Sequence, residues 1–132
     1  LYVGTLDFAG NFSGDKPTSR IYRINIAATD PFTSAEVWAE GFNPITSCIV
    51  VDDDVYVTEY GTKATKYEFG AVVRVRINGD GSAGSRRTMG TDLVQPTGIA
   101  ALGRSIIVSH YGTAPAGAGP DVPGGQIVRL LV

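Results

Sequence analysis

The sequence predicts an all-β fold, and three observations support this. The 17 glycines and seven prolines separate short apolar runs along the 132 residues, as is typical of a chain with many strands and turns. Within the runs the side chains alternate, as in SRIYRINI at residues 19–26. No stretch has a sustained helical period, and residues 35–40, which come nearest, are too short.

A repeat of 51 residues orders the expected strands. Residues 43–61 (NPITSCIVVDDDVYVTEYG) contain two apolar strands, 46–51 and 55–59, joined by an acidic turn. Residues 94–112 (VQPTGIAALGRSIIVSHYG) repeat this hairpin. The same offset relates residues 19–24 to 70–75, so the repeat extends beyond the hairpin.

The remaining strands complete units of four. We expect them at residues 1–5, 19–26, 32–40, 70–77, 85–90 and 125–132. Four strands in a repeat of about 50 residues are typical of a β-propeller blade. The chain then holds about two to two-and-a-half blades: the second to fourth strands of one blade (1–42), a complete blade (43–93), and the first three strands of the last blade (94–132).

This inventory has a consequence for partners. Propellers close with about four to eight blades, so the first and last sheets of this chain would expose apolar faces and unpaired edges. We therefore expect either the remaining blades of a longer protein, of which this chain is a fragment, or other copies of the chain to cover them.

A resemblance to a known family enters at the second hairpin. Residues 95–111 (QPTGIAALGRSIIVSHY) and the ending GGQIVRLLV resemble the C-terminal blades of ScyD/ScyE-type propeller proteins, relatives of NHL-repeat and gluconolactonase-like six-bladed propellers. The resemblance covers residues 43–132 well and the preceding residues loosely. It departs at Ser47, where the pattern has glycine, and at residues 52–54, where P-D-G turns are usual. It implies a propeller fold and a secreted or cell-surface protein, but no particular activity, because propellers host many functions.

Composition bears on partners and compartment. The formal net charge is −2 and the arginines alternate within strands, so we expect no nucleic-acid partner. No apolar run approaches the 18 residues of a membrane span. Asn11 begins an N-glycosylation sequon, which agrees with an extracellular location. The single cysteine, Cys48, lies in an apolar strand and is expected to be a buried structural thiol.

The candidate binding face lies at one end of the sheets. Three long connections are expected on that face, and variation in loops on a regular scaffold indicates binding. Its residues are Thr5, Glu59, Tyr60, His110 and Tyr111. Glu59 and the only histidine, His110, could act as bases or hold a divalent metal in the full propeller. The favoured interpretation is that they are rim residues bonded to loop backbone, because the repeat places a different residue type at each position.

Other candidate sites have simpler interpretations. Asp52, Asp53 and Asp54 are expected to form a solvated turn and not a calcium site, because adjacent carboxylates cannot converge on one ion. Residues 78–81 (NGDG) predict a tight hairpin turn. We predict no metal site within the chain. Four large apolar residues are expected to pack between blades: Phe32, Trp38, Phe42 and Met89.

Three functional hypotheses follow. The favoured one is a non-catalytic binding or structural propeller module, part of a longer extracellular protein. The second is a metal-assisted hydrolase of lactonase type, with Glu59 and His110 near a metal held largely by other blades. The third is a building block that completes a ring or fibre by strand pairing between chains.

Overall fold

The computed structural model describes residues 1–7, 17–61, 69–111 and 124–132, and these form three antiparallel sheets. The first sheet contains β1 (Tyr2–Gly4), β2 (Ser19–Arg23) and β3 (Glu36–Phe42). The middle sheet contains β4 (Ile45–Val51), β5 (Asp54–Glu59), β6 (Phe69–Ile77) and β7 (Ala83–Val94). The third sheet contains β8 (Gly98–Leu102), β9 (Ser105–His110) and β10 (Gln126–Leu131). The predicted all-β class is confirmed.

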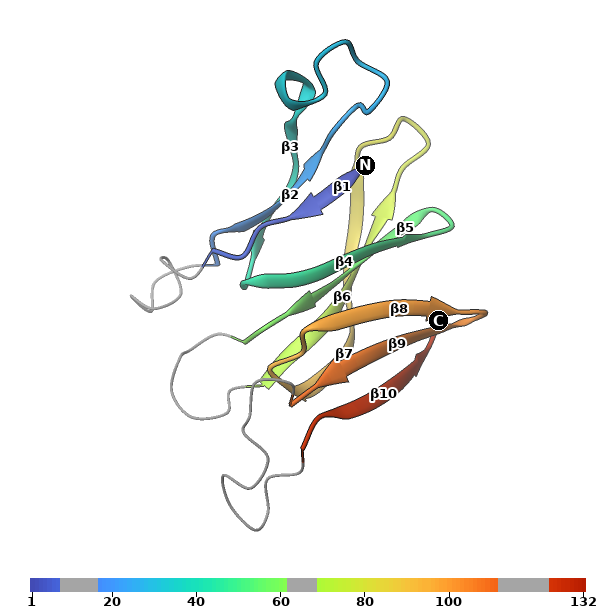
Figure 1. The fold of residues 1–132 in the computed structure, drawn as a ribbon. Helices are drawn as coiled ribbons and strands as arrows, with labels where there is room; N and C mark the ends of the chain where they lie inside the picture. The colour runs from blue at the N-terminus through green and yellow to red at the C-terminus, as the bar shows by residue number, and fades with distance from the viewer. Residues whose placement is uncertain (8–16, 62–68, 112–123) are drawn as a thin grey trace.

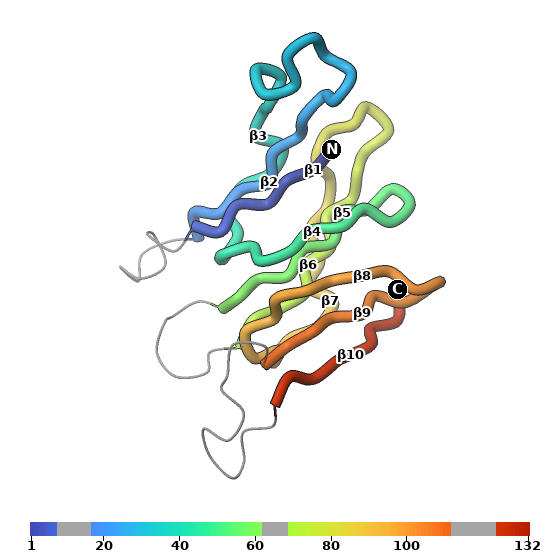
Figure 2. The backbone as a smooth tube through the Cα atoms, viewed as in Figure 1, coloured from blue at the N-terminus to red at the C-terminus, as the bar shows by residue number. Residues whose placement is uncertain are grey.

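The three sheets are stacked in chain order. Figure 1 shows the first sheet in blue to cyan, the middle sheet in green and yellow, and the third in orange and red. Strand β4 contacts both β1 and β8, and the tube in Figure 2 shows the same arrangement. The Ile45 amide donates to the Thr5 carbonyl at 3.1 Å, and the Thr46 hydroxyl donates to the Pro96 carbonyl at 2.6 Å. These two bonds tie the middle sheet to each neighbour.

Strand register repeats from sheet to sheet. Tyr2 lies opposite Arg23, and Tyr56 lies opposite Arg74, in the first and middle sheets. In the third sheet Ile107 lies opposite Arg129. Residues at corresponding positions of the sequence repeat therefore occupy corresponding positions in the three sheets.

Backbone conformation repeats at the turn between β4 and β5 and at the turn between β8 and β9. Asp52 has φ 52° and Gly103, 51 residues later, has φ 55°. Both are in the left-handed region, which glycine adopts freely and aspartate tolerates better than most side chains. One turn geometry therefore serves both hairpins with different residues.

Alternating side chains of the middle sheet are buried on both of its faces. Val55 and Val57 pack in a cluster with the first sheet, whereas Tyr56 packs in a cluster with the third. Each fully buried valine contributes on the order of 1.5 kcal/mol. Burial on both faces explains why every residue of β5, and not only every second one, is buried.

The prediction of a single strand over residues 32–40 is wrong at its start. Phe32–Ser34 form a 3₁₀ turn, and β3 begins at Glu36. The Phe32 amide donates to Asp30 Oδ1 at 3.0 Å, and the Ser34 hydroxyl donates to the Pro31 carbonyl at 2.6 Å. Such local side-chain bonds compete with strand pairing.

Two further strands differ from expectation by more than one residue at an end. The strand expected at 19–26 ends at Arg23, and the strand expected at 85–90 extends over Ala83–Val94. Contrary to the prediction, Phe32 does not pack between the described sheets, because the residue is 86% exposed. Trp38, Phe42 and Met89 do pack between sheets.

Candidate functional site

The structure places the predicted face at one end of the stack. Thr5 follows β1, while Glu59 and His110 end β5 and β9, and these three strands run to the same side of the molecule (Figure 1, left). Pairing is equivalent at each: the Thr5 amide bonds to Arg20, Glu59 lies opposite Ala71, and His110 lies opposite Gln126.

The carboxylate of Glu59 is engaged within the protein. Its side chain is largely buried, with the residue only 9% exposed. Oε1 accepts from the Asn43 amide at 3.0 Å, and Oε2 accepts from Asn43 Nδ2 at 3.2 Å. The carboxylate therefore holds the segment that enters β4, which is a structural use of a buried charge.

Thr5 is also bonded to its neighbouring strand. Its hydroxyl accepts from the Arg20 amide at 2.8 Å and can donate to the Arg20 carbonyl at 3.3 Å. Its own amide donates to the same carbonyl at 2.9 Å. Thr5 continues the pairing of β1 with β2 beyond the end of the strand.

His110 differs from its two counterparts. It is 6% exposed, and neither ring nitrogen has a hydrogen-bond partner within the described parts of the chain. Its ring lies 4.8 Å from that of Tyr111, at an angle of 47°. Asn43, the partner of Glu59, is replaced at the corresponding position by Val94, which offers no side-chain donor or acceptor. The Asn–Glu pair is therefore not repeated in the third sheet.

The two tyrosines are held by their backbones. The Tyr60 amide donates to the Pro44 carbonyl at 2.8 Å, and the Tyr111 amide donates to the Val94 carbonyl at 2.7 Å. Tyr111 has φ 59°, a left-handed conformation that is unusual for a bulky residue. Tyr60 is the first residue after β5, and Tyr111 is the first residue after β9.

The described residues contain no group of three or more His, Cys, Asp or Glu side chains placed to hold a metal. Glu59 and His110 thus share a face and a register position without forming a metal centre from this part of the chain alone. Asn11, the predicted glycosylation site, lies outside the described residues. Within those residues, no helix is long and apolar enough to cross a membrane.

The acidic turn is only partly solvated, so that prediction is wrong for Asp54. Asp54 is 7% exposed, and its Oδ1 lies 3.0 Å from Arg74 Nε. Arg76 approaches both Asp53 and Asp54 at 3.6 Å. The signal for this pairing is present in the sequence, because Arg74 and Arg76 alternate along the strand that pairs with β5. Asp52 and Asp53 are exposed, as expected.

The thiol of Cys48 is half-buried against the cluster between the first and middle sheets. Burial raises the pKa of the Cys48 thiol to about 11, because the thiolate would lose solvation. This agrees with a structural thiol and not a reactive one.

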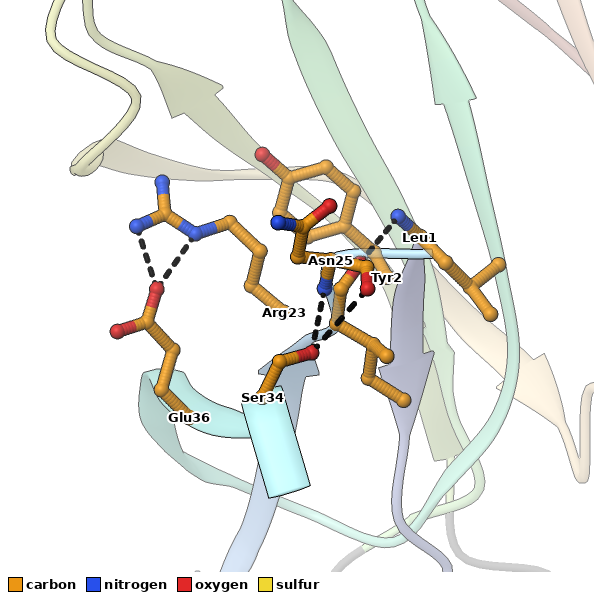
Figure 3. Close-up of a pocket in the computed structure, with 7 residues that line it drawn as sticks. Leu1, Tyr2, Arg23, Asn25, Ser34 and Glu36 are labelled. Atoms are coloured by element: carbon orange, nitrogen blue, oxygen red, sulfur yellow. Dashed lines mark hydrogen bonds and ion pairs between the residues drawn. The ribbon is translucent and has the colours of Figure 1, made fainter. Parts of the chain in front are cut away.

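Sequence reasoning missed a hollow at the opposite end of the first sheet. It has a volume of about 480 Å³ and is lined by Leu1, Tyr2, Arg23, Ile24, Asn25, Ser34 and Glu36. Figure 3 shows the side chains of Arg23 and Glu36 meeting at its edge. Arg23 Nε donates to Glu36 Oε1 at 2.7 Å, and this bond raises the pKa of the guanidinium.

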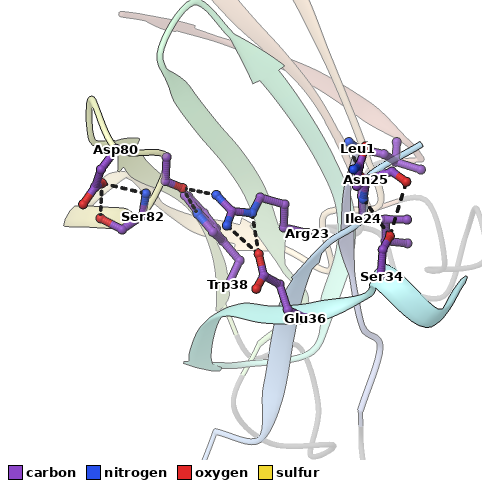
Figure 4. Close-up of polar contacts among 10 residues, drawn as sticks. Leu1, Arg23, Ile24, Asn25, Ser34, Glu36, Trp38, Asp80 and Ser82 are labelled. Carbon is purple, nitrogen blue, oxygen red and sulfur yellow. Dashed lines mark hydrogen bonds and ion pairs between the residues drawn. The ribbon is translucent and has the colours of Figure 1, made fainter. Parts of the chain in front are cut away.

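The same arginine joins two sheets (Figure 4). Arg23 Nη1 and Trp38 Nε1 both donate to the Gly81 carbonyl, at 2.6 and 2.8 Å. The turn that carries Gly81 is the hairpin turn predicted at 78–81, and Asp80 holds it through Ser82. The Arg23 guanidinium, which lies at the edge of the hollow, already donates hydrogen bonds to Glu36 and to the Gly81 carbonyl. It is therefore engaged in structural contacts and does not offer an unpaired charge to a ligand.

Searches of family models, curated proteins and solved structures found no match to this chain.

Proposed function

We propose that this chain is a segment of a β-propeller and acts as a non-catalytic binding or structural module, part of an extracellular protein. The observation that carries the proposal is the contact between sheets, which is repeated residue by residue. In a repeat architecture each unit packs against its neighbours through the same positions, so the interface between units repeats as well as the strands within them.

One side of each interface is the face of a sheet that packs against the sheet following it in the chain. In the first sheet this face presents Ile21, Trp38 and Phe42. In the middle sheet, 51 residues later, the corresponding side chains are Val72, Met89 and Leu93, and these pack against the third sheet. Tyr2 and Tyr56 correspond in the same way.

The other side of each interface is the opposite face of the following sheet. In the middle sheet this face presents Val55, Val57, Val73 and Val75 toward the first sheet. In the third sheet the corresponding side chains pack toward the middle sheet, and they are Ile106, Val108, Val128 and Leu130. The two interfaces thus use the same positions on both sides.

Engagement of the candidate site supports a non-catalytic module. Glu59 is bonded to Asn43 through both oxygens, and Thr5 is bonded to Arg20 in both directions. A side chain whose oxygens already accept hydrogen bonds from within the protein is better suited to fixing the local backbone than to accepting a proton from a substrate. We place the binding surface at the end of the stack where β1, β5 and β9 end.

The ring of His110, which has no hydrogen-bond partner among the described residues, favours one alternative, a metal-assisted hydrolase whose site lies mostly in further blades. Buried polar groups without partners are uncommon and are a reason to look for a ligand. A metal titration followed by calorimetry separates the two functions.

We expect no stoichiometric binding of Ca²⁺, Mn²⁺ or Zn²⁺ to the chain, and no hydrolysis of a simple lactone. Stoichiometric binding that is lost in both Glu59→Gln and His110→Gln, but retained in the exposed control Glu40→Gln, would overturn the non-catalytic proposal. The control makes the same Glu→Gln replacement at Glu40, whose side chain is largely exposed.

A further inference from the structure

The tight turn between β6 and β7 places an asparagine directly before a glycine at the surface. Asn78 and Gly79 begin the sequence NGDG, and both residues are exposed, as is Asp80. Two backbone bonds close the turn. The Asn78 amide donates to the Ser82 carbonyl at 3.0 Å, and the Gly81 amide donates to the Asn78 carbonyl at 2.8 Å. The backbone of the turn is therefore ordered, although its first residues are accessible to solvent.

The backbone nitrogen of Gly79 is open to reaction. Among the described residues its amide has no hydrogen-bond partner, and a Cβ built on Gly79 would meet no atom within 4 Å. A main-chain nitrogen that follows an asparagine can close an unstrained ring with the side-chain carbon Cγ, and such intramolecular attack gains strongly from proximity. Glycine hinders this attack least, because it has no side chain. Asparagine is accordingly among the thermolabile residues.

The side-chain amide of Asn78 is held against the opposite arm of the hairpin. Its Nδ2 donates to Ser82 Oγ at 2.9 Å. Ser82 Oγ donates in turn to Asp80 Oδ1 at 2.6 Å, a bond that Figure 4 shows. Asn78 Oδ1 lies beside Gly84, where an added Cβ would be only 2.5 Å away from it. Ser82 thus restrains rotation of the group that the Gly79 nitrogen would attack.

We propose that Asn78 is a site of spontaneous modification, at which the Gly79 nitrogen attacks the side-chain amide and the Ser82 hydroxyl limits the rate. The Gly79 nitrogen loses its proton to solvent and bonds to Asn78 Cγ. The Cγ–Nδ2 bond breaks, and the leaving nitrogen takes a proton from water and departs as ammonia. Water then opens the cyclic imide at either carbonyl, which gives aspartate or isoaspartate at position 78. The inference does not depend on the proposed function.

The modification has a structural consequence because this turn joins two sheets. The Gly81 carbonyl accepts hydrogen bonds from Arg23 and Trp38 of the first sheet. In isoaspartate the main chain runs through the former side chain and is longer by a carbon atom. The carbonyl of residue 78, which accepts from the Gly81 amide, is then displaced. We therefore expect Gly81 to shift and the contact between the first sheet and this turn to weaken.

Peptide mapping by mass spectrometry after incubation in mildly alkaline buffer tests the site. Conversion at Asn78 should be at least about tenfold faster than at the exposed Asn25, because branched Ile26 follows Asn25. Ser82→Ala should accelerate conversion at Asn78 about fivefold, since a hydrogen bond of this kind contributes about 1 kcal/mol. Gly79→Ala should slow it at least about tenfold, because a Cβ crowds the nitrogen. An added Cβ has no contacts at Gly79, so the fold should persist, which far-UV circular dichroism checks.

Nuclear Overhauser spectra of the converted chain test the consequence. The cross-peak between the Trp38 indole proton and Gly81 should be lost in the isoaspartate form. It should remain in Asn78→Asp, which adds the charge without lengthening the main chain. Conversion at Asn78 no faster than at Asn25 overturns the proposal, and so does an unchanged rate in Ser82→Ala or in Gly79→Ala. An isoaspartate form that keeps the cross-peak contradicts the structural consequence. Loss of the cross-peak in Asn78→Asp contradicts it too, because the charge would then be the cause.

Discussion

Asp54 shows how one buried charge organises a turn. It lies at the start of β5 and is nearly inaccessible. Arg76 lies opposite it across the strands at 3.6 Å, and Arg74, two residues along β6, approaches its carboxylate more closely, at 3.0 Å. In the third sheet the corresponding residues are Ser105 and Arg129, joined by a hydrogen bond of 2.7 Å. The contact between strands is retained although the charge on one partner is not.

Replacement of Asp54 by alanine is expected to lower the free energy of unfolding by about 1–3 kcal/mol, because Arg74 is left half-buried without its partner. Urea denaturation measures the change. The control is Asp53→Ala, which removes an exposed carboxylate and should cost about 0.5 kcal/mol or less. Equal costs for the two variants would show that burial of Asp54 is not the cause.

Cys48 gives a pH dependence with a defined sign. Burial raises the pKa of its thiol from 9.0 to about 11, so the unfolded chain loses this proton at lower pH than the folded one. Stability should therefore fall as the pH rises from about 9 to about 11. Cys48→Ala should remove this part of the decline, as measured by denaturation at a series of pH values. An unchanged decline in the variant would contradict the raised pKa.

At the scale of the element, alternation and the 51-residue repeat were sufficient to predict most strands. Val55 and Val57 alternate with Tyr56, and this pattern determines which side chains face which neighbouring sheet. The 3₁₀ turn at Phe32–Ser34 was missed because its bonds to Asp30 and Pro31 are local and interrupt an otherwise strand-like composition.

The candidate site was predictable in position but not in bonding. Register follows from the repeat, so Thr5, Glu59 and His110 could be aligned before the structure was known. The partner of Glu59 is Asn43, on the segment before β4, and nothing in the spacing of these residues predicts that its side chain turns back toward β5. The hollow beside Arg23 was also missed, because its lining comes from separate segments of the first sheet.

The contact between the first sheet and the β6–β7 turn has its own test. Trp38→Phe removes the Nε1 bond to the Gly81 carbonyl but keeps an aromatic ring in the cluster. Arg23 still donates to that carbonyl, so the expected loss is about 1–2 kcal/mol of unfolding free energy. The control Phe32→Leu, at an exposed position, should change stability by about 0.5 kcal/mol or less. A loss of this size in the control alone would contradict the assigned roles.

On the scale of the whole molecule, the stack is held by two interfaces that share one design. Each interface combines an apolar cluster with a few hydrogen bonds. The apolar clusters use corresponding positions in the two interfaces, whereas the hydrogen bonds do not. Arg86 reaches from β7 to the Glu40 and Gly41 carbonyls and lies 3.7 Å above the ring of Phe42. Between the middle and third sheets, the Thr46 hydroxyl bonds to the Pro96 carbonyl. The apolar cluster therefore defines the repeat, while the polar bonds are particular to each interface.

Nuclear Overhauser contacts between the sheets test the stack most directly. We expect cross-peaks from the Trp38 indole proton to Gly81, across the first interface. We also expect cross-peaks from the Gly90 α-protons to the Leu130 methyl groups, across the second interface, where the two residues approach closely. Absence of both sets, with the pairing contacts within each sheet retained, would contradict the repeated interface on which the proposed function depends.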